Sequence, residues 1–144
     1  MRGLHLMAEL LGCSCHEALL SDAARLAALC RQAVAASGLE AVGEVFHDFE
    51  PGGATGVILL AESHLAVHTW PELRGVTLDA YVCNYSADNR GRAERLIATL
   101  LTAFAPATHE LRQVERGLIA PVPAVPPATL PVRTGTAAGD RSGR

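Results

Sequence analysis

The 144-residue chain contains no lysine, and all 12 of its basic residues are arginines. This absence excludes any mechanism that holds a substrate or pyridoxal phosphate as a Schiff base on lysine. The chain also lacks a basic surplus, because its formal net charge is −3 at pH 7. A protein without a basic face has no surface suited to a phosphate backbone, so we expect no nucleic-acid partner.

Long apolar runs are absent as well. No uninterrupted apolar stretch approaches the roughly 18 residues that a transmembrane helix requires, and residues 1–5 do not resemble a signal peptide. We therefore expect a cytoplasmic protein that does not bind membranes. The cysteines have no zinc-finger spacing, so reduced thiols are expected. They are Cys13, Cys15, Cys30 and Cys83.

Hydrophobic residues, in contrast, are abundant: they make up 49% of the chain, and only 19% of it is charged. A single small domain cannot hide that much apolar surface alone, so we expect a homo-oligomer. The composition changes at Pro121, where prolines begin to recur among alanine, glycine and threonine. We therefore expect one domain over 1–119 and a disordered tail over 120–144.

The apolar pattern predicts that strands and helices follow one another along the domain. Strand segments outnumber helices, and two of them form a central pair. We expect an α+β fold, a two-layer sandwich in which a mainly antiparallel sheet carries two helices on one face. The strands are predicted near 4–11, 42–50, 56–61, 65–70, 76–83 and 108–115.

The two predicted helices are amphipathic. A capping-box spacing between Ser14 and Glu17 begins the first helix, and Gly38 closes it. The second helix follows a cluster of capping residues and stops before Pro106. The cluster consists of Ser86, Asp88 and Asn89.

The stretch 60–72 places polar side chains inside predicted core strands. His64 and His68 are four residues apart, which suits metal ligation on a helix, but this region is strand-like and no third ligand is near, so no metal is expected. Ser63 and His68 would suit a serine hydrolase, yet no G-x-S-x-G elbow is present. Each side chain alone could simply satisfy a buried hydrogen bond. Their occurrence together favours chemistry.

The order Glu62-Ser63-His64, then 68–72 (His-Thr-Trp-Pro-Glu), then Cys83 resembles the pyruvoyl-dependent S-adenosylmethionine decarboxylases, in their small bacterial and archaeal form. The resemblance extends from His5 to about Gly117. In this family a serine attacks the preceding carbonyl to give an ester, and elimination with loss of ammonia leaves a pyruvoyl group. The resemblance implies cleavage between Glu62 and Ser63 into a β chain, 1–62, and an α chain, 63–144.

The resemblance also implies the catalytic roles. Ser63 would become the pyruvoyl cofactor that forms a Schiff base with the substrate amine. His68 matches the proton acceptor of processing, and Cys83 matches the proton donor that quenches the carbanion after CO2 leaves. Thr55 stands where the family usually has a serine that supports processing, and it keeps the hydroxyl.

Substrate-binding roles follow in the same way. Phe49 and Trp70 match positions around the adenine, and Glu72 matches a carboxylate that holds the ribose. The implied activity converts S-adenosylmethionine to its decarboxylated form, the aminopropyl donor for spermidine. Two alternatives stay open. The scaffold could decarboxylate arginine or ornithine, whose cationic tails suit Glu9 and Glu72, or the chain could be an unprocessed, inactive partner subunit.

Strand alternation adds an expectation about assembly. It places Ser63 on the same face as Leu65 and on the opposite face from His68, so Ser63 and His68 of one protomer should not meet. The resemblance implies a homodimer of αβ units with shared active sites. Two-fold pairing would bring Ser63 and Cys83 of one protomer to Thr55 and His68 of the other.

Overall fold

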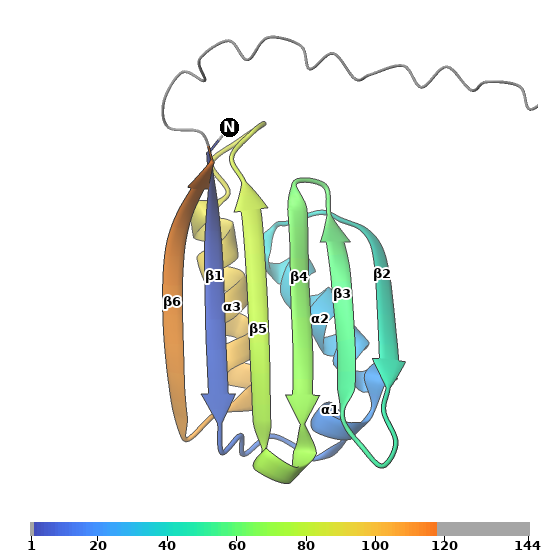
Figure 1. Ribbon diagram of the computed structural model, residues 1–144. Helices are drawn as coiled ribbons and strands as arrows, with labels where there is room; N and C mark the ends of the chain where they lie inside the picture. The colour runs from blue at the N-terminus through green and yellow to red at the C-terminus, as the bar shows by residue number, and fades with distance from the viewer. Residues whose placement is uncertain (1, 118–144) are drawn as a thin grey trace, which may run out of the picture.

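The computed structural model describes residues 2–117, so the tail expected over 120–144 lies outside the described residues. Six strands form one antiparallel sheet in the order β2-β3-β4-β5-β1-β6. Figure 1 shows the helices on one side of this sheet, which confirms the two-layer α+β sandwich. The strands are β1 (Arg2–Leu11), β2 (Ala41–Asp48), β3 (Ala54–Leu60), β4 (Ser63–Trp70), β5 (Gly75–Cys83) and β6 (Thr108–Gly117). The helices are α1 (Ala18–Ser21), α2 (Ala23–Ser37) and α3 (Arg90–Phe104), with a 3-10 turn η1 (Pro71–Leu73).

The first predicted helix is divided in two. The capping box expected at Ser14 is wrong, because its hydroxyl donates to the carbonyl oxygen of Ala105 at 3.0 Å. Helix α1 is a single turn, and α2 starts where the Asp22 carboxylate accepts two backbone N–H groups of the first turn. Gly38, with φ 80°, ends α2 as predicted. The sheet therefore carries three helices on one face rather than two.

Helix α3 ends just before Pro106, as predicted. Of the three residues expected to cap its start, only Asp88 does so with its side chain. The Asp88 carboxylate accepts the first backbone N–H of the helix at 3.1 Å. The side chains of Ser86 and Asn89 instead donate to the carboxylate of Glu62. The loop before α3 is thereby tied to the turn between β3 and β4.

The core lies between the sheet and the helices. Leu65 and Val67 of β4 are 1% and 0% exposed, so the predicted alternation holds along the body of this strand. Thr69, also buried, accepts the backbone N–H of Ala54 at 2.8 Å and donates to the carbonyl oxygen of Leu20 at 2.7 Å. These bonds fix β4 to β3 and α1. Other large buried side chains include Leu4, Leu6, Leu10, Leu26, Ile58, Leu78, Leu96, Ile97, Leu100 and Phe104.

The other side of the sheet faces the viewer in Figure 1, and no helix of residues 2–117 covers it. We call it the open face; its side chains include His5 of β1, His64 and His68 of β4, and Tyr81 and Cys83 of β5. Within the same range, no helix is long and apolar enough to cross a membrane. Nor do His, Cys, Asp or Glu side chains gather there in a group that could hold a metal ion.

Candidate active site

A strained residue directly follows the turn between β3 and β4. Leu60 pairs with Ser63 across the two-residue turn of Ala61 and Glu62. Neither residue of the turn has a positive φ, but Ser63, the first residue of β4, takes a positive-φ conformation, with φ 150°. A side chain with a Cβ rarely adopts it, at a cost of about 1–3 kcal/mol. The strain therefore lies next to the Glu62–Ser63 peptide bond.

Glycine at position 63 should relieve this strain. Ser63→Gly and Ser63→Ala both lack the hydroxyl, so neither can be cut through it, and only Ser63→Ala keeps the Cβ. We expect Ser63→Gly to be more stable by about 1 kcal/mol, because the relief outweighs the extra chain entropy of glycine. Thermal unfolding should show a melting temperature about 2–5 °C higher than that of Ser63→Ala. A lower melting temperature for Ser63→Gly would contradict the strain.

Glu62 is held at both its backbone and its side chain. The N–H of Cys83 donates to the Glu62 carbonyl oxygen at 2.9 Å. The Glu62 carboxylate accepts the N–H groups of Tyr85 (3.1 Å) and Ser86 (3.2 Å), the side-chain amide of Asn89 (3.0 Å) and the Ser86 hydroxyl. The Ser86 hydroxyl, followed by the Tyr85 N–H, lowers the pKa of Glu62. The carbonyl side of the Glu62–Ser63 bond is therefore fixed.

An aromatic cluster lies beside this bond on the open face. The hydroxyl of Ser63 is 3.4 Å from Nδ1 of His64, so the predicted alternation does not hold at Ser63, where the positive φ departs from the regular pleat. The rings of His64 and Tyr81 are 6.0 Å apart. A hydrogen bond with the Cys83 thiol raises the pKa of Tyr81, and the Arg116 guanidinium lies 4.5 Å from the centre of the Tyr81 ring. Cys83 follows Val82, the residue paired with Ser63, so it lies on the strand next to the Glu62–Ser63 bond.

A second group of predicted site residues lies toward the other end of β4. Thr55 and His68 are paired across β3 and β4, and the Thr55 hydroxyl lies 2.6 Å from Nδ1 of His68. A cavity of about 360 Å³ is lined by His68 with Phe49, Trp70 and Glu72. The structure therefore brings together the three predicted substrate-binding residues and the predicted processing histidine.

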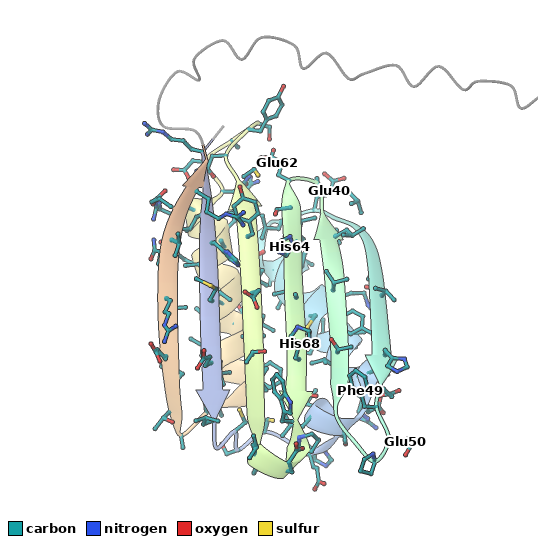
Figure 2. The ribbon with its side chains drawn as sticks, viewed as in Figure 1. Glu40, Phe49, Glu50, Glu62, His64 and His68 are labelled. Atoms are coloured by element: carbon teal, nitrogen blue, oxygen red, sulfur yellow. The ribbon has the colours of Figure 1, made fainter. Side chains whose placement is uncertain are left out.

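The two groups are separate in one protomer. Figure 2 shows Glu62 at one end of the sheet, His68 farther along β4, and Phe49 toward the opposite end. Ser63 and His68 are five residues apart on one strand, which separates their Cα atoms by about 17 Å. One protomer therefore does not bring the hydroxyl of Ser63 to His68, but because of their distance along the strand and not because they lie on opposite faces.

Comparison with known proteins shows to which family the chain belongs. The model of the S-adenosylmethionine decarboxylase family matches residues 4–117. The chain belongs to this family. The match covers every strand and helix between these two positions, so the family suggested by the motif around Ser63 is confirmed.

The similarity of individual relatives supports the same family assignment. The S-adenosylmethionine decarboxylase proenzyme of Picrophilus torridus is 35% identical over 115 residues, covering 80% of this chain and 84% of its own. That of Archaeoglobus fulgidus is 33% identical, covering 80% and 97%. The crystal structure of the adenosylmethionine decarboxylase of Aquifex aeolicus aligns with a TM-score of 0.73 at 32% identity, covering 82% of this chain and 92% of its own. Neither the arginine or ornithine alternative nor the inactive subunit is favoured.

Several contacts of this decarboxylase were not predicted from its sequence. Tyr81 is two residues before Cys83, so strand alternation could have indicated that their side chains are neighbours. Asn89 was assigned to helix capping alone. Its contact with Glu62 joins residues far apart in the chain, and no periodic pattern in the loop indicates it.

Proposed function

We propose that this family member is a self-processing S-adenosylmethionine decarboxylase that cuts its own chain between Glu62 and Ser63. The observation that carries the proposal is the strained φ of 150° at Ser63, with the preceding carbonyl oxygen already accepting the Cys83 N–H at 2.9 Å. Strained residues cluster at reactive sites. The products are a β chain, 1–62, and an α chain, 63–144.

Cleavage requires only atoms of the chain and one water molecule. Oγ of Ser63 loses its proton and bonds to the carbonyl carbon of Glu62, while the peptide C–N bond breaks and the nitrogen takes a proton, giving an ester. Loss of the Ser63 Cα proton then breaks the Cβ–O bond and frees the Glu62 carboxylate. Water displaces the nitrogen as ammonia, which leaves a pyruvoyl group at residue 63, with no external oxidant or reductant.

The backbone of Cys83 contributes to the first step. As Oγ attacks, the Glu62 carbonyl oxygen gains negative charge, and a donor already 2.9 Å away stabilises that charge without moving. In the later step, the elimination from the ester, the imidazole of His68 is the proposed proton acceptor, and its Nδ1 is held by Thr55. The residues present therefore fit a pyruvoyl group made from Ser63.

The pyruvoyl group supplies the carbonyl that binds the substrate amine and withdraws electrons as CO2 leaves. The thiol of Cys83 lies on the open face beside residue 63 and is the proposed donor of the proton that replaces CO2. The cavity lined by Phe49, Trp70 and Glu72 is the proposed nucleoside site: two aromatic rings can contact adenine, and a carboxylate can accept the ribose hydroxyls. A reducing compartment such as the cytoplasm keeps this thiol available.

The complete site requires two copies of the chain. Val45, Leu59 and Val114 of the open face are 64%, 50% and 44% exposed, which suits burial against a second sheet. A two-fold axis that crosses the strands between two facing sheets places the Ser63 end of one over the His68 end of the other. We propose a homodimer with two shared sites, in which each protomer supplies half of each site.

Shared sites predict complementation between inactive variants. Ser63→Ala and His68→Ala are each expected to be inactive alone. In a heterodimer, one site carries both defects and the other carries none, so co-expression should restore about one quarter of wild-type cleavage and activity with random pairing. Gel analysis and CO2 release would measure the recovery. No recovery, with heterodimers shown to form, would place Ser63 and His68 of each site in the same protomer.

Substrate choice is tested by offering S-adenosylmethionine, arginine and ornithine separately to the processed protein and measuring CO2 release. We expect release from S-adenosylmethionine alone, because the cavity carries two aromatic side chains and a single carboxylate. Preferential release from arginine or ornithine would overturn the substrate assignment. It would leave the cleavage at Ser63 unaffected.

A further inference from the structure

The side chain of Asn89 is buried and joins Glu62 to Cys83, whose backbone groups meet at the Glu62 carbonyl oxygen. It is 3% exposed. Its Nδ2 donates to the Glu62 carboxylate at 3.0 Å and to the carbonyl oxygen of Cys83 at 2.8 Å. Its Oδ1 accepts the guanidinium of Arg92 at 3.1 Å, and its backbone N–H donates to Oδ1 of Asn84 at 2.9 Å. Every polar atom of this side chain is therefore used.

Apart from the contact with Arg92, these bonds do not serve the start of α3. Asn89 occupies the N-cap position, yet its side chain makes no capping hydrogen bond, and the carboxylate of Asp88 accepts the first helical N–H instead. A buried asparagine with both amide hydrogens directed to Glu62 and Cys83 is costly to replace, because the groups it binds would lose their partner. The side chain is therefore arranged around the turn that contains the scissile bond.

Ser63 lies where the fixed residue Glu62 meets the paired strand β4. The loop 84–89 binds the carboxylate of Glu62, and the N–H of Cys83 donates to the carbonyl oxygen of Glu62. On the other side, Ser63 begins β4, which is paired with β3 and β5 along its whole length. The two constraints meet at Ser63, the residue with φ 150°.

We infer that Asn89 is a positioning residue for self-cleavage: through it, the loop 84–89 holds Glu62 so that Ser63 keeps its strained conformation and the scissile carbonyl stays on the Cys83 N–H. The inference rests on the proposed cleavage between Glu62 and Ser63. It assigns to the loop after β5 a role in the rate of maturation. Asn89 itself touches neither the hydroxyl of Ser63 nor the proposed nucleoside cavity.

The first test follows cleavage over time after cell-free synthesis of the full chain. Asn89→Ala should be cut at least about tenfold more slowly than wild type, because a hydrogen bond to a charged group is lost and the bond is less well positioned. Asp88→Ala is the matched control: it removes a hydrogen bond at the start of the same helix but none to Glu62, and should be cut at the wild-type rate. Equal rates for Asn89→Ala and wild type would overturn the inference.

A second test separates positioning from general stability. In uncleavable Ser63→Ala, removing Asn89 releases strain as well as hydrogen bonds, whereas in Ser63→Gly there is no strain to release. Asn89→Ala should therefore lower the melting temperature less in the Ser63→Ala background than in the Ser63→Gly background. Equal decreases in melting temperature in the two backgrounds would overturn the inference that Asn89 maintains the strain at Ser63.

Ser86→Ala covers the case in which Asn89→Ala does not fold. Ser86 is exposed, and its replacement removes the hydroxyl that donates to Glu62 without disturbing the core. Slower cleavage of Ser86→Ala supports the loop as a clamp on Glu62, and an unchanged rate contradicts it. A wild-type chain that is never cut after Glu62 would instead overturn the proposed function, so the two failures are distinguishable.

Discussion

Ser63→Ala is expected to remain an intact chain of 15.1 kDa and to release no detectable CO2 from S-adenosylmethionine. Both losses have one cause, because the hydroxyl that attacks the Glu62 carbonyl is also the origin of the pyruvoyl carbonyl. No other side chain can replace it: the chain has no lysine to hold another carbonyl cofactor. Denaturing mass spectrometry and a CO2-release assay measure the two effects.

The control for this variant is Ser21→Ala. Ser21 is an exposed serine of α1 whose hydroxyl donates to the carbonyl oxygen of Glu17, far from the turn in sequence. It should be cut and should turn over like the wild type. An uncut Ser63→Ala that still decarboxylated S-adenosylmethionine would show that the carbonyl of the reaction comes from somewhere other than residue 63.

Cys83→Ala should separate the two activities. The proposed contribution of Cys83 to cleavage is its backbone N–H, which alanine keeps, whereas its contribution to turnover is the thiol proton, which alanine lacks. Cleavage should therefore stay near the wild-type rate, while kcat falls by about 10²–10⁴, the usual contribution of a positioned general acid. Gel analysis of the purified chain and steady-state kinetics provide the two measurements.

Cys15→Ala is the matched control, since Cys15 is also a half-buried free thiol but its contact with Arg74 is made through its backbone carbonyl. It should retain both activities. A wild-type kcat for Cys83→Ala would remove the thiol from the mechanism. A parallel loss of cleavage and turnover would show that the thiol, and not only the backbone N–H, is required for processing.

The sheet and the group of site residues around His68 could be predicted from the sequence because both depend on local patterns. Alternation in 65–70 predicts which side chains of β4 face the helices, and burial of Leu65 and Val67 confirms it. The alternation does not hold at Ser63, and it is the distance along β4 that separates Ser63 from His68. The family motif identified Thr55 and Glu72, which the fold places beside His68 in one hydrogen bond and one cavity.

The loop between β5 and α3 could not be predicted in the same way. Ser86 and Asn89 have the composition of helix caps, and composition alone does not say which acceptor such a side chain finds. The Glu62 carboxylate competes successfully because a charged acceptor forms stronger hydrogen bonds than a backbone carbonyl. The division of the first helix has a similar origin: Asp22 caps α2 better than Ser14 could cap a longer helix, once the Ser14 hydroxyl is bound to Ala105.

Mass spectrometry of the purified wild-type chain under denaturing conditions tests the central claim most directly. Self-cleavage predicts two species, residues 1–62 with a free carboxyl terminus and residues 63–144 with a blocked N-terminus that reacts with carbonyl reagents. A single intact chain of 15.1 kDa, or an α chain with a free serine amine at residue 63, would contradict it.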